Sequence, residues 1–139
     1  MHRAVPHQAD IAIEIEADSL EDLFRESLIA LIELSRGDAP SSVDNGVQEA
    51  VVIESEGFDD EERLVGLLGE LLFATQTLGW GAREVTSVEF HPDGRVSAKL
   101  NCVPAGGGEK LHREIKAVTY QDLKITFLDK WRVKIVFDV

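Results

Sequence analysis

Apolar and polar residues alternate near both ends of the chain. Between residues 11 and 16, isoleucine occupies every second position, and alanine or glutamate stands between. Successive side chains of a strand point to opposite faces, so a period of two predicts a strand with one buried face. The same alternation returns between residues 131 and 139. If the alternation is extended to residue 10, Asp10 lies on the same face of the first strand as the glutamates. In the last strand, Asp138 lies on the face opposite to that of Trp131.

Two longer stretches repeat their leucines at the spacing of an amphipathic helix. The first extends from Ser19 to about residue 35 and the second from Asp59 to about residue 75. Ser19 and Asp59 are suitable N-caps, because their side-chain oxygens accept hydrogen bonds from free backbone N–H groups. Gly66 and Gly69 lie inside the second helix, where glycine is unfavourable, and we expect close packing against a sheet to compensate.

Shorter apolar stretches predict the remaining strands, at residues 47–55, 85–90, 96–103, 116–120 and 123–128. The sequence His91-Pro92-Asp93-Gly94-Arg95 is typical of a tight hairpin turn. Because hairpins dominate the second half, we predict an α+β fold in which two main helices pack on one face of a mostly antiparallel sheet. With 139 residues, the chain is expected to form a single compact domain over residues 1–139.

The charge balance narrows the possible partners. The chain carries 14 lysines and arginines against 26 aspartates and glutamates, a net charge of −12. This surplus repels phosphates, so we expect no direct binding of nucleic acid. It suits basic protein surfaces and hard divalent cations, although an acidic surface also serves solubility alone. We found no leader-like segment and no apolar stretch of the roughly 20 residues that span a membrane, so we expect no membrane association and a cytoplasmic location.

Cys102 is the only cysteine, which excludes an internal disulfide and a cysteine-rich zinc site. A single thiol is usually a small buried residue, and nucleophilic catalysis would need a base beside it. The Gly-x-Ser-x-Gly, His-Glu-x-x-His and Rossmann glycine motifs do not occur in the sequence. The standard hydrolase, metalloprotease and dehydrogenase classes therefore gain no support.

Carboxylates near both ends of the sequence are candidates for a cation site. Calcium and magnesium ions prefer several oxygen ligands. Asp10, Asp138 and the terminal carboxylate of Val139 could supply them if the first and last strands are neighbours. The simpler alternative is that these acids are solvated, as acids at strand ends usually are. His7 could add a nitrogen ligand or an acid–base group, or could be a solvated or capping histidine.

A second polar set precedes the predicted strand at residues 116–120. His112, Glu114 and Lys116 occupy alternate positions, so in an extended segment they would project to one side. Such a triplet could pair with Asp10. From the pattern alone, we favour a simpler interpretation, in which these opposite charges are solvated and lie in a row on the surface.

Four sequence features together resemble those of one protein family, the archeases. They occur in the family's order and cover nearly the whole chain: His7-Gln8-Ala9-Asp10, Glu70-Leu71-Leu72-Phe73, Ile115-Lys116-Ala117-Val118-Thr119-Tyr120 and the closing Asp138-Val139. The Lys-Ala-Val-Thr-Tyr string is the specific part. One departure is Gln121, since the family commonly has histidine after the Thr-Tyr pair. If that histidine shapes the site, cation affinity or protonation would differ here.

The resemblance implies a function in RNA processing in which the chain itself does not ligate RNA. Archeases act as non-ligating cofactors of an RtcB-type RNA ligase, promoting its guanylylation and multiple turnover in tRNA splicing or RNA repair. The resemblance implies a divalent cation, calcium or magnesium, held by Asp10, Asp138 and Val139. It also makes Lys116 a partner-facing or active-centre contact, with His7, His112 and Glu114 as further candidates.

Two other functions remain open from the sequence. The first is a small metal-dependent hydrolase that holds its ion with Asp10 and Asp138 and uses His7 or His112 as the acid–base group. The second is a chaperone or modulator of another RNA-processing enzyme, such as a tRNA methyltransferase, because an acidic domain can bind several basic partners. A purely structural role is the last possibility. The cation site and the proposed activator mechanism require that the two ends of the sequence meet in space.

Overall fold

The computed structural model describes residues 10–36, 48–103, 115–120 and 122–139. Along these residues the elements are β1 (Ile11–Ala17), α1 (Leu20–Arg36), β2 (Glu49–Glu56), α2 (Asp60–Leu72), a π-helical turn (Phe73–Thr77), β3 (Gly81–Phe90), β4 (Arg95–Val103), β5 (Ala117–Thr119), β6 (Thr126–Phe127) and β7 (Trp131–Asp138). None of these helices is long and apolar enough to cross a membrane.

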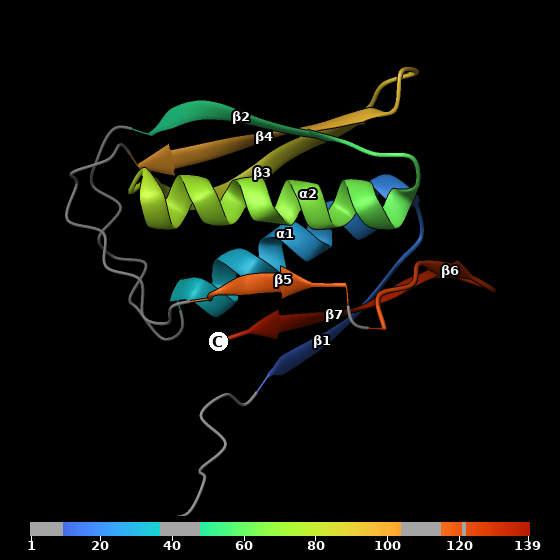
Figure 1. Ribbon diagram of the computed structural model, residues 1–139. Helices are drawn as coiled ribbons and strands as arrows, with labels where there is room; N and C mark the ends of the chain where they lie inside the picture. Colours follow the sequence, from blue (N-terminus) through green and yellow to red (C-terminus); the bar gives the residue numbers. More distant parts are fainter. Residues whose placement is uncertain (1–9, 37–47, 104–114, 121) are drawn as a thin grey trace, which may run out of the picture.

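The strands form two antiparallel sheets with the helices between them (Figure 1). One sheet has the order β1-β7-β5, with β6 also paired to β7, and the other has the order β2-β4-β3. α2 packs on β2 and α1 on β3, while on the other side α1 contacts β1 and β7 and α2 contacts β5. The predicted α+β class and antiparallel pairing are therefore confirmed, with the strands divided between two sheets rather than gathered in one.

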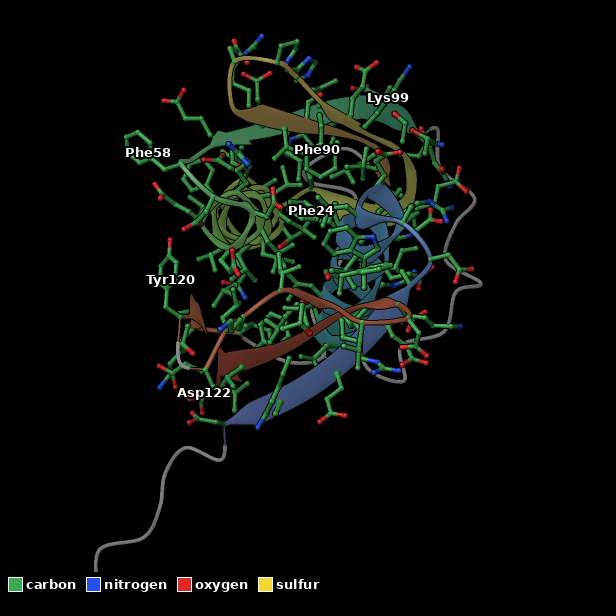
Figure 2. The ribbon with its side chains drawn as sticks, turned by 90° about the vertical axis from the view of Figure 1, so that its right-hand side faces the viewer. Phe24, Phe58, Phe90, Lys99, Tyr120 and Asp122 are labelled. Atoms are coloured by element: carbon green, nitrogen blue, oxygen red, sulfur yellow. The ribbon has the colours of Figure 1, made fainter. Side chains whose placement is uncertain are left out.

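The helices can serve two sheets because their apolar surfaces are wide. In α2, Leu64, Leu67, Leu68 and Leu71 are at most 1% exposed, and buried positions so close together cover more than one narrow stripe. Phe24 of α1 is fully buried and meets Phe90 of β3 edge-on (Figure 2), with ring centroids 4.9 Å apart. The core therefore fills the space between the two sheets and links them through the helices.

Both predicted helix caps are present. The Ser19 hydroxyl accepts a hydrogen bond from the Asp22 N–H at 3.0 Å, and the Asp59 carboxylate accepts one from the Glu62 N–H at 2.8 Å. Each cap satisfies a backbone donor that the first turn of a helix leaves free.

The two glycines of α2 differ in their surroundings. A Cβ on Gly66 would lie 3.0 Å from the Cβ of Ser55 in β2, whereas a Cβ on Gly69 would have no heavy atom within 4 Å. The Ser55 hydroxyl also donates a hydrogen bond to the Arg63 carbonyl of α2 at 2.7 Å. The expected close packing against a sheet therefore holds for Gly66 and is wrong for Gly69.

Several element bounds differ from the sequence-based expectations. β3 begins at Gly81, four residues earlier than predicted, because Gly81 and Ala82 pair with Val103 and Cys102 of β4. Of the predicted strand at residues 123–128, only Thr126 and Phe127 form a strand. The expected strand at 47–55 runs from Glu49 to Glu56, with residue 47 outside the described residues. The strand expected at 116–120 is shortened to Ala117–Thr119.

Candidate functional site

The first and last described strands pair directly, which brings the two ends of the sequence together. β1 runs antiparallel to β7, and the last registered pair joins Ile11 to Phe137. One further step in the same register places Asp10 opposite Asp138, and opposite residues of an antiparallel pair share one face of the sheet. Figure 1 shows the start of β1 and the end of β7 on the same side of the molecule. We call this end of the sheet the β1–β7 tip.

The Asp138 carboxylate is partly shielded at this tip. The residue is half-buried, and its Oδ1 atom is buried without a hydrogen-bond partner among the described residues. Asp10 is exposed. A buried carboxylate oxygen with no donor is costly, and a like charge directly opposite adds repulsion. Among the described residues, no hydrogen-bond donor satisfies this oxygen of Asp138.

β5 lies on the other side of Asp138. The Lys116 N–H donates a hydrogen bond to the Asp138 carbonyl oxygen at 2.7 Å, and Ala117 is the residue in register with Asp138. Ala117 is exposed and lies on the face that Asp138 shares with Asp10. Sequence reasoning did not single out Ala117, although its place directly after Lys116 in the specific motif was a signal.

Lys116 is thus joined to the tip through its backbone. Its side chain is exposed, and none of the ion pairs among the described residues links it to Asp10 or Asp138. The pairing of Lys116 with Asp10 that the sequence raised is not formed. The lysine ammonium instead remains available to solvent or to a partner.

Opposite charges line up farther along the same face. Glu14 lies opposite Lys134 and Glu16 opposite Arg132 in the β1–β7 register, and Arg132 Nε lies 3.0 Å from Glu16 Oε2. These residues and Lys124 border a hollow of about 450 Å³. The tip differs from the rest of this face because two acids, rather than an acid and a base, stand opposite each other.

Several predicted residues lie outside the described part of the chain. These are His7, His112 and Glu114, and also Gln121, which stands where the family commonly has histidine. Their suggested roles as ligands, acid–base groups or partner contacts stay predictions. Val139 directly follows Asp138 and is half-buried, so its place in the sequence puts it at the tip.

The oxygen atoms of the β1–β7 tip fit a hard divalent cation only in part. Asp10 and Asp138 supply carboxylates without positive partners, and the shielded Oδ1 of Asp138 is the kind of atom that a metal ion would satisfy. Calcium takes about six to eight oxygen ligands. Within the described ranges no group of three or more His, Cys, Asp or Glu side chains could hold a metal ion. Water, the Val139 carboxylate or oxygens of a partner would have to complete the coordination.

Cys102 is not placed for nucleophilic chemistry. It is 1% exposed, on β4 against the helices, and burial raises the pKa of its thiol to about 11. Since the thiolate is the nucleophile, a raised pKa keeps this side chain unreactive at neutral pH. The expectation of a small buried residue is confirmed.

Sequence comparison places the chain in a family. Residues 2–139 match the model of the archease protein family. The chain is 31% identical to the protein archease of Archaeoglobus fulgidus over 142 residues, which covers 97% of this chain and 96% of that protein. It is 33% identical to the protein archease of Pyrococcus abyssi over 144 residues, covering 96% and 94%. The chain therefore belongs to the archease family, as its motifs predicted.

Solved structures support the same fold. The chain aligns with the crystal structure of an archease from Thermotoga maritima, described as a possible chaperone, with a TM-score of 0.71 and 23% identity over 100% of this chain and 98% of that one. It also aligns with the solution structure of protein 1598 from Methanobacterium thermoautotrophicum, with a TM-score of 0.67 and 23% identity over 94% and 93%. At this identity the likeness concerns the fold alone.

Proposed function

We propose that this chain is a non-ligating protein cofactor that activates an RtcB-type RNA ligase, promoting the guanylylation of the ligase and its repeated turnover in tRNA splicing or RNA repair. Membership of the archease family supports the proposal. The net charge of −12 supports it further, because this charge favours a basic protein partner over direct contact with RNA.

The β1–β7 tip carries the proposal. Asp10 and Asp138 come from opposite ends of the sequence and face each other on neighbouring strands, with Lys116 attached beside them by its backbone. Such a tip would offer two carboxylates and an exposed lysine to the active-site cleft of a partner. In the complex, the two carboxylates would face cationic groups of the ligase and Lys116 would contact an anionic group.

A divalent cation, calcium or magnesium, is part of this proposal. Asp10, Asp138 and the Val139 carboxylate would hold it, and when bound it neutralises the facing carboxylates and offers coordination positions to oxygens of a partner. The carboxylate of Asp138 is held in place because its strand, β7, is paired with β1 on one side and β5 on the other. Asp10, at the outer strand, is free to adjust.

The test is a guanylylation and ligation assay of the ligase from the same organism, with and without this protein. We expect faster guanylylation and more than one turnover per ligase when the protein is present. The Asp10→Asn, Asp138→Asn double variant should lose most of this stimulation while keeping its fold. Glu89→Gln, an exposed charge change on β3 in the other sheet, serves as the matched control and should stimulate normally.

Three outcomes would redirect the assignment. Full stimulation by the folded double variant would exclude the β1–β7 tip as the active surface. No stimulation by the wild-type protein, together with recovery of a tRNA methyltransferase from a native extract, would favour the chaperone-like alternative. Turnover of phosphoester substrates by the protein alone, sensitive to the same variants, would favour the hydrolase.

A further inference from the structure

β1 is an edge strand with one side unpaired. Within the described part of the chain it pairs only with β7, and Figure 1 shows it at the outer border of its sheet. In an antiparallel pair, alternate residues direct their N–H and C=O groups toward the neighbour and the others direct them away. Along its 7 residues, β1 therefore presents backbone donors and acceptors that no described strand satisfies.

An apolar groove follows this free edge. A hollow of about 320 Å³ lies between β1 and α1, and its apolar lining consists of Ile13 and Ile15 from β1 with Ile29 and Ala30 from α1. All four residues are half-buried, and the isoleucines pack against the hydrophobic core on their inner side. The groove thus combines open apolar surface with an adjacent row of unpaired backbone groups.

The charged residues that line the groove are all acidic. They are Glu14 and Glu16 on β1 and Glu26 and Glu33 on α1, with no lysine or arginine among the lining residues. In the part of the chain described here, Glu16 alone of the four forms an ion pair, with Arg132. Glu14 faces Lys134 across the sheet. The α1 side of the rim therefore presents two carboxylates without a basic partner.

We propose that this groove binds an extended segment of a partner protein, in which lysine or arginine alternates with apolar residues, as a strand added beside β1. Backbone hydrogen bonds to the free edge would align the segment. Its apolar side chains would then face Ile13, Ile29 and Ala30, because alternate side chains of a strand point to one face. Its basic side chains would point to the opposite face, beside Glu14 and Glu16, while Glu26 and Glu33 on α1 add negative charge at the rim of the groove. The arrangement goes beyond the function proposed above, since it involves a separate surface and requires neither the cation nor a ligase.

The charges argue against a second copy of this chain as the occupant. Pairing of β1 with β1 of another molecule would bring Glu14 and Glu16 close to the same residues of the other copy, and like charges across strands repel. Acidic residues beside an edge strand can also serve only to prevent such self-association. The experiment must therefore distinguish peptide binding at this edge from a role of the glutamates that is limited to preventing self-association.

The probe is a blocked, fluorescent peptide of 7 residues, the length of β1, in which arginine and valine alternate. Anisotropy gives its affinity, and nitrogen-15 NMR locates it. We expect shift changes concentrated in residues 11–17 and 26–33. Glu26→Lys with Glu33→Lys should weaken binding by about tenfold, equivalent to about 1.4 kcal/mol. The control, Glu49→Lys with Glu89→Lys, changes the net charge equally on the other sheet and should weaken it far less.

A second variant and a second peptide isolate the groove from general charge attraction. Ala30→Leu keeps the charge but fills the lining, so it should also reduce affinity. A peptide that differs only by a proline at its central position cannot complete the strand pairing and should bind more weakly. Equal losses in both double variants, equal affinity of the two peptides, or no binding at all would overturn the proposal. None of these variants alters Asp10 or Asp138, so failure here is distinguishable from failure of ligase activation.

Discussion

The facing carboxylates of the β1–β7 tip lead to a prediction in which one substitution changes the sign of its effect. Asp138→Asn keeps the shape of the side chain and removes one of the two charges. Opposite residues of an antiparallel pair have their Cβ atoms about 4.5 to 5.5 Å apart, and like charges so placed destabilise the pair by roughly 0.2 to 1 kcal/mol. Because Asp10 is exposed, solvent and salt keep the repulsion at no more than about 1 kcal/mol. Without divalent ions, we therefore expect the variant to be more stable than wild type by about 1 kcal/mol.

With calcium the order should reverse. An ion that binds only the folded protein adds about 2.7 kcal/mol of stability when its concentration is about 100 times the dissociation constant. Wild type gains this term and the variant loses most of it, so the variant becomes the less stable protein by about 1 to 2 kcal/mol. Asp10→Asn should behave in the same way, because the two residues share the site.

The assay is urea unfolding followed by circular dichroism, in excess chelator and then in millimolar calcium or magnesium. Glu89→Gln is the control and should show the same difference from wild type in every buffer. The reasoning is refuted if Asp138→Asn changes the free energy of unfolding by the same amount with chelator and with either ion. A reversal with one ion alone would identify the ion.

Three further predictions concern the core and the helices. Gly69→Ala should raise the free energy of unfolding by about 1 kcal/mol, because its added methyl group meets no other atom; Gly66→Ala should gain less or destabilise in the same denaturation series, and equal gains would contradict the packing described. Phe24→Ala should cost about 3 to 5 kcal/mol, measured by the shift in the urea midpoint; a cost near zero would show that this side chain is not buried. Cys102 should react slowly with a thiol reagent in the folded protein and rapidly in urea, and equal rates would contradict its burial and raised pKa.

The sequence was sufficient to predict the helices and strands whose own residues show a clear hydrophobic period. β1, α1, α2, β4 and β7 fall within one or two residues of expectation apart from the end of α2. There the expected helix continues as a π-helical turn, Phe73–Thr77. The hydrophobic period of 3.6 residues does not reveal the change from α-helix to π-helix, because that change depends on how the turn packs.

The meeting of the first and last strands also had a signal in the sequence. Glu14 and Glu16 are paired in register with Lys134 and Arg132, so opposite charges occur at the same period of two in both strands. Cross-strand attraction favours that register. The division into two sheets had no such signal, because strand order depends on contacts between elements far apart in the sequence. The shielding of Asp138 Oδ1 and the groove beside β1 were likewise not predictable without coordinates.

The central position of β7 has a consequence for how the molecule forms. The hairpin of β3 and β4 joins residues close in the sequence, whereas the pair Ile15–Val133 joins residues 118 positions apart (133 − 15 = 118). Closing so long a loop costs more entropy than closing a hairpin, so contacts of this kind form late. An intermediate could hold β2, β3, β4 and α2 in place and still lack any surface on which the opening aspartate meets the closing one. The β1–β7 tip would then form only when the two ends of the sequence have paired.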